Sequence, residues 1–382
     1  MPRNSQNQVP GVTRVVGGEV VLPDASVADL DIEIVDGRIV GVAARGSLPS
    51  PDDMTHVTTL DAGGRLVAPG LIDIQINGGW GHDFTHDPDG IAIVARHLPS
   101  TGVTAFVPTI VTSPLDRRRA AIDAIRATGP TPASGAAVLG LHFEGPAIAA
   151  ARRGAHDPRY IGVPADDEIE TWTAENGVVM ATVAPELDGA AELVARLVDQ
   201  GVVVAIGHTA CTVDEFERAR AAGATVVTHL FNAMARFEHR SPGPIGATLA
   251  DPTVRAGLIC DGIHVDPTAI RMAWRTLGAD RTILVTDAVA ALGLDVMVGS
   301  DGVRTAAGVL AGSALPLDAA VRNLVAFAGC APAEALCAAS TTPAAALGLA
   351  DRGRIEPGAV ADLVLFDDDL HPARTIIGGT VE

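Results

Sequence analysis

Eight apolar runs alternate with helix-like segments between residues 71 and 288. The runs are LIDIQI, TAFVPTI, AVLGLHFEG, VVMATVAPE, VVVAIGHT, TVVTHLFN, RAGLICDGIH and TILVTDA. Segments such as AAELVARLVDQG and VDEFERARAAG, which lie between them, mix Ala, Arg and Glu as amphipathic helices do. Strands that are apolar on both faces are typical of parallel sheets covered by helices. We therefore predict an α/β fold, a (β/α)8 TIM-like barrel, with a doubly wound open sheet as the alternative.

Both ends of the chain have a different pattern. Short β-branched runs broken by Gly, Asp and Pro occur in RVVGGEVVLP and DIEIVDGRIVGVA near the start and in GRIEPGAVADLVLFD near the end. The DG pair is a hairpin signal. We predict a small β-sandwich domain formed by both termini, residues 12–66 and 350–382, around a barrel domain at 67–349. The polar residues 1–11 are predicted to be a disordered tail.

Charge and residue usage exclude several functions. The formal net charge of −19 argues against binding to nucleic acid or to an anionic membrane surface. All 27 basic residues are arginine, so a lysine Schiff base, a P-loop and a carboxylated lysine bridging two metals are excluded. The four cysteines form no CxxC pair, which favours a reduced, cytoplasmic protein over a disulfide framework. No apolar run reaches membrane-spanning length.

Polar residues close most of the apolar runs, at the strand ends where barrel enzymes carry their chemistry. They are Gln75, Asn77, Glu144, Glu186, His208, His229, His264 and Asp287. Any one of them is ordinary as a hydrogen-bonded residue or a helix cap, but the whole set would converge on one barrel mouth. Two histidines and a glutamate form a common zinc-ligand set that leaves one position open. Glu144, His208 and His229 could supply it.

The same residues carry a family resemblance. DAGGRLVAPGLID and GRIEPGAVADLVLFD resemble the flanking sheet segments of the amidohydrolase superfamily. LHFEGP, RRGAHDP, IGHTACT, THLFNAM, DGIHVD and LVTDA resemble, in the same order, the motifs of the N-acetylglucosamine-6-phosphate deacetylase family within it. The resemblance covers nearly the whole chain after about the first ten residues. It implies hydrolysis of the acetamide of N-acetyl-D-glucosamine 6-phosphate to D-glucosamine 6-phosphate and acetate, in amino-sugar metabolism.

The resemblance also implies roles for individual residues. Glu144, His208 and His229 would bind the metal, Asp287 would be the catalytic acid and base, and His156 would hydrogen-bond the acetyl carbonyl. The substrate's sugar phosphate would be held by Asn232, the backbone of Ala233, Arg240 and His264. The counterpart of Arg240 reaches across a dimer interface in the family, so a homodimer is implied.

Gln75 and Asn77 stand where other members of the superfamily carry His-x-His. The resemblance implies that chains with Gln-x-Asn bind one metal rather than two, and neutral amides are indeed poor zinc ligands. We therefore expect one divalent ion per chain, with Zn²⁺ favoured and Fe²⁺, Co²⁺ or Mn²⁺ able to use the same ligands. Gln75 and Asn77 would hydrogen-bond the water or line the pocket.

Three alternative functions stay open at this stage. The substrate could be another acetamido-sugar phosphate, such as N-acetylgalactosamine 6-phosphate. The chain could instead be a cyclic-amide hydrolase, or a barrel that binds a sugar phosphate without turning it over. His82 and His86 are interpreted as solvated loop residues, and His142, two positions before Glu144, as a pocket-lining or supporting residue.

Overall fold

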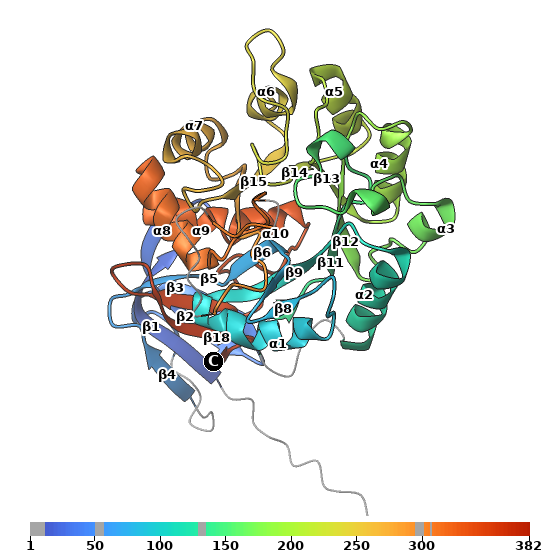
Figure 1. Ribbon diagram of the computed structural model, residues 1–382. Helices are drawn as coiled ribbons and strands as arrows, with labels where there is room; N and C mark the ends of the chain where they lie inside the picture. Colours follow the sequence, from blue (N-terminus) through green and yellow to red (C-terminus); the bar gives the residue numbers. More distant parts are fainter. Residues whose placement is uncertain (1–11, 50–56, 129–134, 295–301, 306–307) are drawn as a thin grey trace, which may run out of the picture.

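The computed structural model describes residues 12–49, 57–128, 135–294, 302–305 and 308–382. Figure 1 shows a barrel ringed by helices, beside a separate sheet that both ends of the chain build. The tail predicted at residues 1–11 lies outside the described residues. In the described part of the chain, no helix is both long and apolar enough to cross a membrane.

Parallel strands from all eight predicted runs form the barrel. They are β6 (Leu71–Ile76), β9 (Val103–Val111), β10 (Ala137–Val138) with β11 (Leu141–Glu144), β12 (Val178–Val183), β13 (Val203–Ile206), β14 (Val226–Val227), β15 (Arg255–Ile259) and β16 (Thr282–Val285). The ends meet where Asp287 N donates to Gln75 O at 2.8 Å and Asn77 N donates to Ala288 O at 2.7 Å. The barrel prediction is confirmed, and the open doubly wound sheet is excluded.

Helices cover the outside of the barrel. They are α1 (Gly90–His97), α2 (Leu115–Thr128), α3 (Asp166–Ile169), α4 (Ala190–Asp199), α5 (Val213–Ala221), α6 (Gly243–Ala250), α7 (Pro267–Leu277), α8 (Leu317–Ala328), α9 (Pro332–Ala338) and α10 (Thr341–Ala346), with short 3-10 turns at Leu98–Thr101, Ala150–Arg152 and Pro158–Tyr160. Helix α4 buries Leu193, Val194 and Leu197 on one stripe. Helix α5 begins with a capping box between Thr212 and Glu215.

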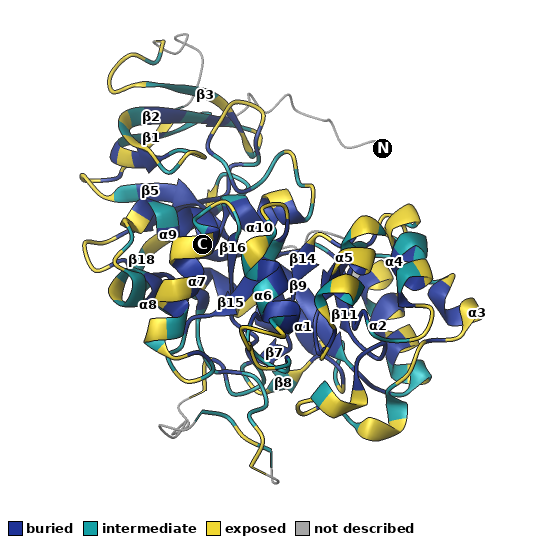
Figure 2. Cartoon of the chain, turned by 90° about the horizontal axis from the view of Figure 1, so that it is seen from above, coloured by how far each residue is buried: buried dark blue, intermediate teal, exposed yellow. Residues whose placement is uncertain are grey.

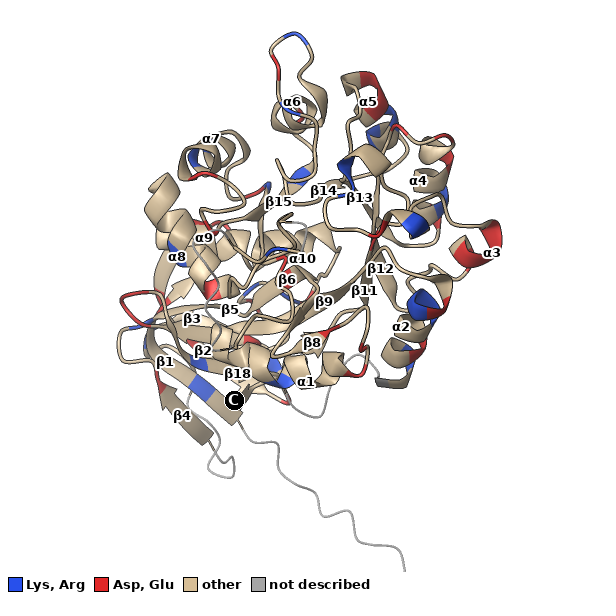
Figure 3. Cartoon of the chain, viewed as in Figure 1, with Lys and Arg blue, Asp and Glu red and all other residues tan. Residues whose placement is uncertain are grey.

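Burial and charge follow this layering. Figure 2 shows the barrel strands as buried and the outer faces of α3, α4 and α5 as exposed. Figure 3 shows charged residues gathered on the outer helices α2 to α5, with few on the barrel strands. Small and branched side chains pointing inward, such as Ile72, Ala105, Val107, Ala205 and Ile283, fill the barrel interior. The interior is therefore a packed core, and the chemistry is confined to its mouth.

The second sheet has its own core. Its strands are β1 (Val12–Val21), β2 (Val27–Val35), β3 (Arg38–Ala44), β4 (Val57–Asp61), β5 (Leu66–Pro69), β17 (Leu363–Phe366), β18 (Pro372–Ile377) and β19 (Thr380–Val381). Strand β1 pairs with β4 over its first half and with β5 beyond the irregularity at Val15/Gly18, so the sheet branches there. Between the branches lies a cluster that includes Ile32, Ile34 and Leu363. The small β-rich unit from both termini is confirmed, while its boundaries at 12–66 and 350–382 stay a prediction.

The hairpin signal in this sheet has the expected geometry. Asp36 and Gly37 join β2 to β3 with φ angles of 48° and 76°. Positive φ at both central residues is the requirement of a type I′ turn, which DG sequences meet. The local sequence therefore meets the backbone requirement of this turn.

Candidate active site

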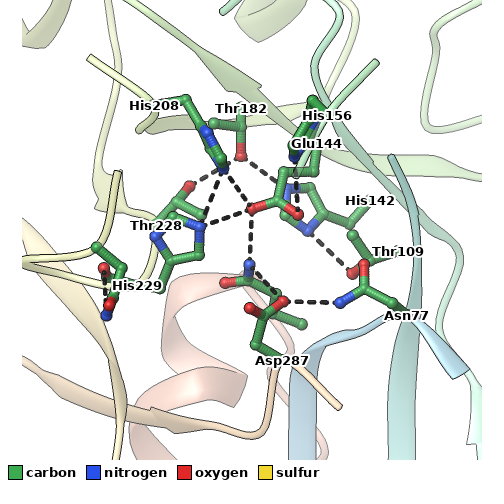
Figure 4. Close-up of polar contacts among 12 residues, drawn as sticks. Asn77, Thr109, His142, Glu144, His156, Thr182, His208, Thr228, His229 and Asp287 are labelled. Carbon is green, nitrogen blue, oxygen red and sulfur yellow. Dashed lines mark hydrogen bonds and ion pairs between the residues drawn. The ribbon is translucent and has the colours of Figure 1, made fainter. Parts of the chain in front are cut away.

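A cavity of about 570 Å³ opens at the carboxyl ends of the barrel strands. Nine of the predicted site residues line it: Asn77, Glu144, His156, His208, His229, Asn232, Ala233, His264 and Asp287. Gln75 lies just below, with its amide Nε2 2.9 Å from Glu144 Oε1. Arg240 does not line this cavity. Figure 4 shows how the side chains from different strands point toward one another.

Glu144, at the end of β11, is the centre of the polar cluster. Its Oε1 lies 2.9 Å from His229 Nε2 and 3.2 Å from His208 Nε2. Burial alone would raise the pKa of this carboxyl, but the hydrogen bonds from His208 and His229 outweigh burial and hold its pKa well below the usual range. Burial likewise opposes a charge on His229, yet its hydrogen bond to Glu144 leaves the His229 pKa raised. Glu144 is therefore an ionised carboxylate facing two imidazoles.

These three side chains fit a metal ion. His208 Nδ1 lies 2.9 Å from the carbonyl oxygen of Arg152, so Nδ1 donates to that carbonyl and Nε2 is the nitrogen left to bind a metal ion. His208 Nε2 and His229 Nε2 are only 3.1 Å apart. Ligand atoms held in a tetrahedron by one zinc ion at about 2.0–2.1 Å would lie about 3.3 Å from one another. The spacing of the two nitrogens and of Glu144 Oε1 is close to that value, and the donor set suits a divalent ion.

His156 is a fourth candidate ligand by distance alone. Glu144, His156 and His208 each offer a ligand atom within 4.8 Å of the others. However, His156 Nδ1 accepts the backbone N–H of Thr112 at 3.3 Å and lies 2.8 Å from the Thr112 hydroxyl. Burial also lowers the pKa of His156 to about 3, with the nearby His208 adding to the effect. A neutral ring that accepts at Nδ1 carries its proton on Nε2, so His156 presents a donor to the cavity rather than a ligand.

Asp287 follows β16 and faces Glu144 across the mouth. Its Oδ1 accepts Asn77 Nδ2 at 2.7 Å and Gln75 Nε2 at 3.3 Å. Among the described residues, no hydrogen bond reaches its Oδ2. Burial, and after it the charge of Glu144, raises the pKa of Asp287 to about 6. Gln75 and Asn77 point to the same side of the strand, because both amides reach the same oxygen.

The backbone at this mouth is strained. His208, His229 and Asp287 have φ angles of 49°, 23° and 49°, in the left-handed region that non-glycine residues rarely adopt. Each of them lies two residues beyond the end of its strand. Strain of this kind persists only where surrounding contacts enforce it, and it gathers at functional sites. The sharp turns aim three side chains from different strands at a common centre.

A buried polar layer supports Glu144 from below. His142 lies on β11, and its Nδ1 is 3.2 Å from the Thr109 hydroxyl while its Nε2 is 2.8 Å from the Thr182 hydroxyl. Thr182 Oγ1 in turn lies 2.8 Å from Thr228 Oγ1, next to His229. Burial lowers the pKa of His142 to about 4, so the ring is neutral. His142 is thus a supporting residue. Sequence reasoning missed its threonine partners and Thr112, because threonine is ordinary in any strand.

The predicted phosphate end is only partly assembled within one chain. Asn232 and Ala233 line the cavity, as does His264, whose Nδ1 lies 2.6 Å from Asp261 Oδ2. Arg240 is exposed in the loop between Met234 and Gly243, which stands away from the barrel beside α6 (Figure 1). The structure therefore does not bring Arg240 to its own chain's cavity.

Other singled-out residues have ordinary partners. His82 Nδ1 lies 2.6 Å from Asp87 Oδ2, and His86, whose side chain is 62% exposed, lies 3.1 Å from Asp83. His86 nevertheless lines the rim of the cavity. Glu186 braces the turn after His208 by accepting the N–H of Ala210 at 2.5 Å. None of these contacts adds a ligand to the Glu144 cluster.

A parallel-strand barrel with a carboxylate, two imidazoles and a second carboxyl converging at its mouth suits metal-dependent hydrolysis. Residues 66–381 match the amidohydrolase family. The chain therefore belongs to the amidohydrolase family.

Particular relatives are closely similar over most of the chain. It is 42% identical over 344 residues to the N-acetylglucosamine-6-phosphate deacetylase of Rattus norvegicus, covering 84% of each protein. It is 36% identical over 365 residues to the N-acetylgalactosamine-6-phosphate deacetylase of Escherichia coli O157:H7, covering 92% of this chain and 94% of the relative. A crystallised variant of the Mycobacterium smegmatis N-acetyl-D-glucosamine-6-phosphate deacetylase, in complex with N-acetyl-D-glucosamine-6-phosphate, is 31% identical, with a TM-score of 0.85 over 98% of this chain and 99% of that one.

Proposed function

We propose that this chain is a metal-dependent deacetylase that hydrolyses N-acetyl-D-glucosamine 6-phosphate to D-glucosamine 6-phosphate and acetate. The observation that carries the proposal is the convergence of Glu144, His208 and His229 within 3.2 Å of one another, opposite the buried carboxyl of Asp287. The 42% identity to a protein of that activity supports the choice of substrate. Cyclic-amide hydrolysis and mere sugar-phosphate binding gain no such support.

Glu144, His208 and His229 would hold one divalent ion, and Zn²⁺ suits two imidazoles and a carboxylate. Fe²⁺, Co²⁺ or Mn²⁺ could use the same ligands. When bound, the ion would lower the pKa of a water molecule and polarise the amide carbonyl. A second ion is not expected, because Gln75 and Asn77 already donate their amide hydrogens to Glu144 and Asp287.

Asp287 would move the proton. Its Oδ1 is occupied by the two amide donors, so Oδ2 is the oxygen left to accept a proton from the attacking water. The same carboxyl would then return that proton to the departing sugar nitrogen, since an amine leaves readily only when protonated. One residue would thereby serve first as base and then as acid.

His156 would stabilise the negative charge that develops on the acetyl oxygen. Its Nε2–H points into the cavity, 3.8 Å from Glu144 Oε2, and Thr112 holds the ring from the other side. A fixed donor inside a site that excludes water needs no reorganisation during the reaction, which makes its hydrogen bond effective.

The phosphate would be bound by Asn232, the backbone of Ala233 and His264, all on the cavity wall. The described wall carries no arginine, although a guanidinium is well suited to bidentate contact with phosphate. The exposed Arg240 would supply it to the neighbouring subunit of a homodimer. A reduced, cytoplasmic location fits the free state of all four cysteines.

The test is acetate release from N-acetylglucosamine 6-phosphate and from the unphosphorylated sugar, with metal per chain counted on the same sample. We expect rapid release from the phosphate alone, at about one metal per chain. Release from neither compound, with metal bound, would contradict the proposed activity. N-acetylgalactosamine 6-phosphate is tested in parallel, because the Escherichia coli relative at 36% identity acts on that epimer by name.

A further inference from the structure

Strand β6 changes phase just before the active site. Ile72 and Ile74 belong to the barrel interior, whereas Ile76 packs into the outer core under the helices. In an unbroken strand these three residues would share one face. The pairing with β9 is irregular between Asp73 and Ile76, which places the switch there. The irregularity allows two consecutive residues, Ile74 and Gln75, to point into the barrel, and the Gln75 amide thereby reaches Glu144.

Side chains replace the ladder hydrogen bonds across this irregularity. The Gln75 N–H donates to Asp73 Oδ1 at 3.2 Å, and the Ile76 N–H donates to the Thr109 hydroxyl at 3.2 Å. A strand that bulges must satisfy the backbone groups that leave the ladder, or their burial would cost stability. Asp73 and Thr109 meet that need.

Asp73 also holds the opposite strand. Its Oδ2 accepts the Thr286 hydroxyl at 2.5 Å, and its Oδ1 accepts the Thr286 N–H at 3.4 Å. Thr286 immediately precedes Asp287, whose own N–H donates to Gln75 O at 2.8 Å. One carboxyl therefore joins the first and last barrel strands at the point where both enter the active site.

Asp73 has no charged partner to explain its burial. Its relative exposure is 0%, and no arginine or histidine among the described residues forms an ion pair with it. Burial raises its pKa to about 7, with the donors from Thr286 and Gln75 opposing that rise. A buried carboxyl without a counter-charge is costly, so the donors from Gln75 and Thr286 must offset that cost.

We propose that Asp73 is a positioning residue, which holds the β6 bulge and the start of the β16 turn so that the Gln75 amide meets Glu144 and the Asp287 carboxyl meets Asn77. It touches neither substrate nor metal. Its effect on turnover rests on the proposed function, whereas its effect on the geometry does not.

The experiment compares Asp73→Ala and Asp73→Asn with the wild-type protein. Asp73→Ala removes every acceptor, and we expect kcat to fall about 10- to 100-fold, as supporting residues of metal sites do, with KM changed less than about threefold. Asp73→Asn keeps Oδ1 for the two backbone donors, and we expect it to restore kcat to within about threefold of wild type. Thr286→Val and its conservative partner Thr286→Ser repeat the comparison from the other strand, in case Asp73→Ala does not fold.

Asp362→Ala is the matched control. Asp362 is also a buried carboxyl, 5% exposed, but it lies in the terminal sheet, where it pairs with Arg352. We expect this variant to lose stability and keep kcat. Unchanged kcat in Asp73→Ala, or equal loss in Asp73→Ala and Asp73→Asn, would overturn the inference.

A readout without turnover separates this inference from the proposed activity. In a crystal structure of Asp73→Ala at unchanged metal content, we expect the 2.9 Å contact between Gln75 and Glu144 and the 2.7 Å contact between Asn77 and Asp287 to be broken. Intact contacts would contradict the inference even if the wild type were inactive on the sugar phosphate. If the wild type releases no acetate while the two contacts break in Asp73→Ala as expected, only the proposed function is contradicted.

Discussion

The barrel mouth and the terminal sheet both bury carboxyl groups, but they treat them differently. In the terminal sheet, Asp31 accepts the N–H of Gly46 at 2.7 Å, and Asp362 pairs with Arg352. Each of these carboxyls has a backbone donor or an arginine of its own. At the mouth, Glu144 and Asp287 face each other and a set of imidazoles, and the charge of Glu144 helps to raise the pKa of Asp287. Buried carboxyls close enough to perturb one another's pKa are typical of the part of a molecule that acts on a ligand.

The backbones of the two regions differ in the same way. The tight turn of the terminal sheet uses Asp36 and Gly37, which tolerate positive φ. The mouth imposes positive φ on His208, His229 and Asp287, where the side chain rather than the backbone is needed. Positive φ in the mouth thus orients side chains toward the site, whereas in the terminal sheet Ala25, Asp36 and Leu370 adopt it only in the turns between strands.

Metal removal should separate the two regions most strongly. Chelation should abolish acetate release, and added Zn²⁺ should restore it, because Glu144, His208 and His229 present ligand atoms within about one metal–ligand tetrahedron of one another at the cavity. The far-ultraviolet circular dichroism of the whole protein should persist in the apoprotein. Elemental analysis of the same sample verifies that the metal has been removed. Full activity in the metal-free protein would contradict the contrast between the mouth and the terminal sheet.

Asp287→Asn should have the next largest effect. Loss of a residue that acts as both base and acid should lower kcat by about 10²- to 10⁴-fold. The amide keeps the size of the side chain, so metal content and substrate binding should stay close to wild type. Turnover and metal per chain are measured together, and an activity near that of the wild type would exclude Asp287 from proton transfer.

Arg240→Ala should affect binding rather than chemistry. We expect KM for the sugar phosphate to rise about tenfold, since a charge-assisted phosphate contact contributes about 1.5–3 kcal/mol, with a smaller change in kcat. The exposed Arg236 in the same loop provides the control, and Arg236→Ala should leave KM unchanged. Mixing Arg240→Ala with an Asp287→Asn variant should partly restore activity if Arg240 acts on the neighbouring subunit. No restoration would confine its role to its own chain or exclude it.

Asp362→Asn should have the smallest effect on turnover. The substitution removes an ion pair with Arg352 from the terminal sheet and should lower the free energy of unfolding by about 1–3 kcal/mol. At a temperature where the protein stays folded, kcat should equal that of the wild type. A loss of kcat in Asp362→Asn relative to the wild type would show that the terminal sheet contributes to the chemistry. It would contradict the contrast between the two regions.

Much of the fold could be predicted because it depends on local patterns. The eight apolar runs became the eight barrel strands, and the DG hairpin formed as its sequence requires. The positions of the site residues at the strand ends also followed, since strand order in a barrel brings carboxyl ends together. The phase of β6 could not be predicted, because the bulge depends on Asp73 meeting Thr286, which lies 213 residues further along the chain.

The division of roles among the histidines needed tertiary contacts as well. His156 and His208 both lie close to Glu144, and distance alone makes either a ligand. The partner of each Nδ1 separates them, because His208 Nδ1 donates a hydrogen bond to the Arg152 carbonyl while His156 Nδ1 accepts one from the Thr112 N–H. No sequence pattern predicts such a partner, since any backbone group can supply the hydrogen bond.

Side-chain periodicity, the absence of lysine and the Gln-x-Asn pair are properties of the chain itself, and they set the fold class and limited the metal chemistry. Which atoms meet at the mouth was decided by folding: Gln75 against Glu144, Asn77 against Asp287, and Arg240 away from its own cavity. The physical reason is range. Hydrophobic patterns act between neighbours along a strand or helix, whereas proton positions, pKa shifts and ligand geometry depend on groups brought together from distant parts of the chain.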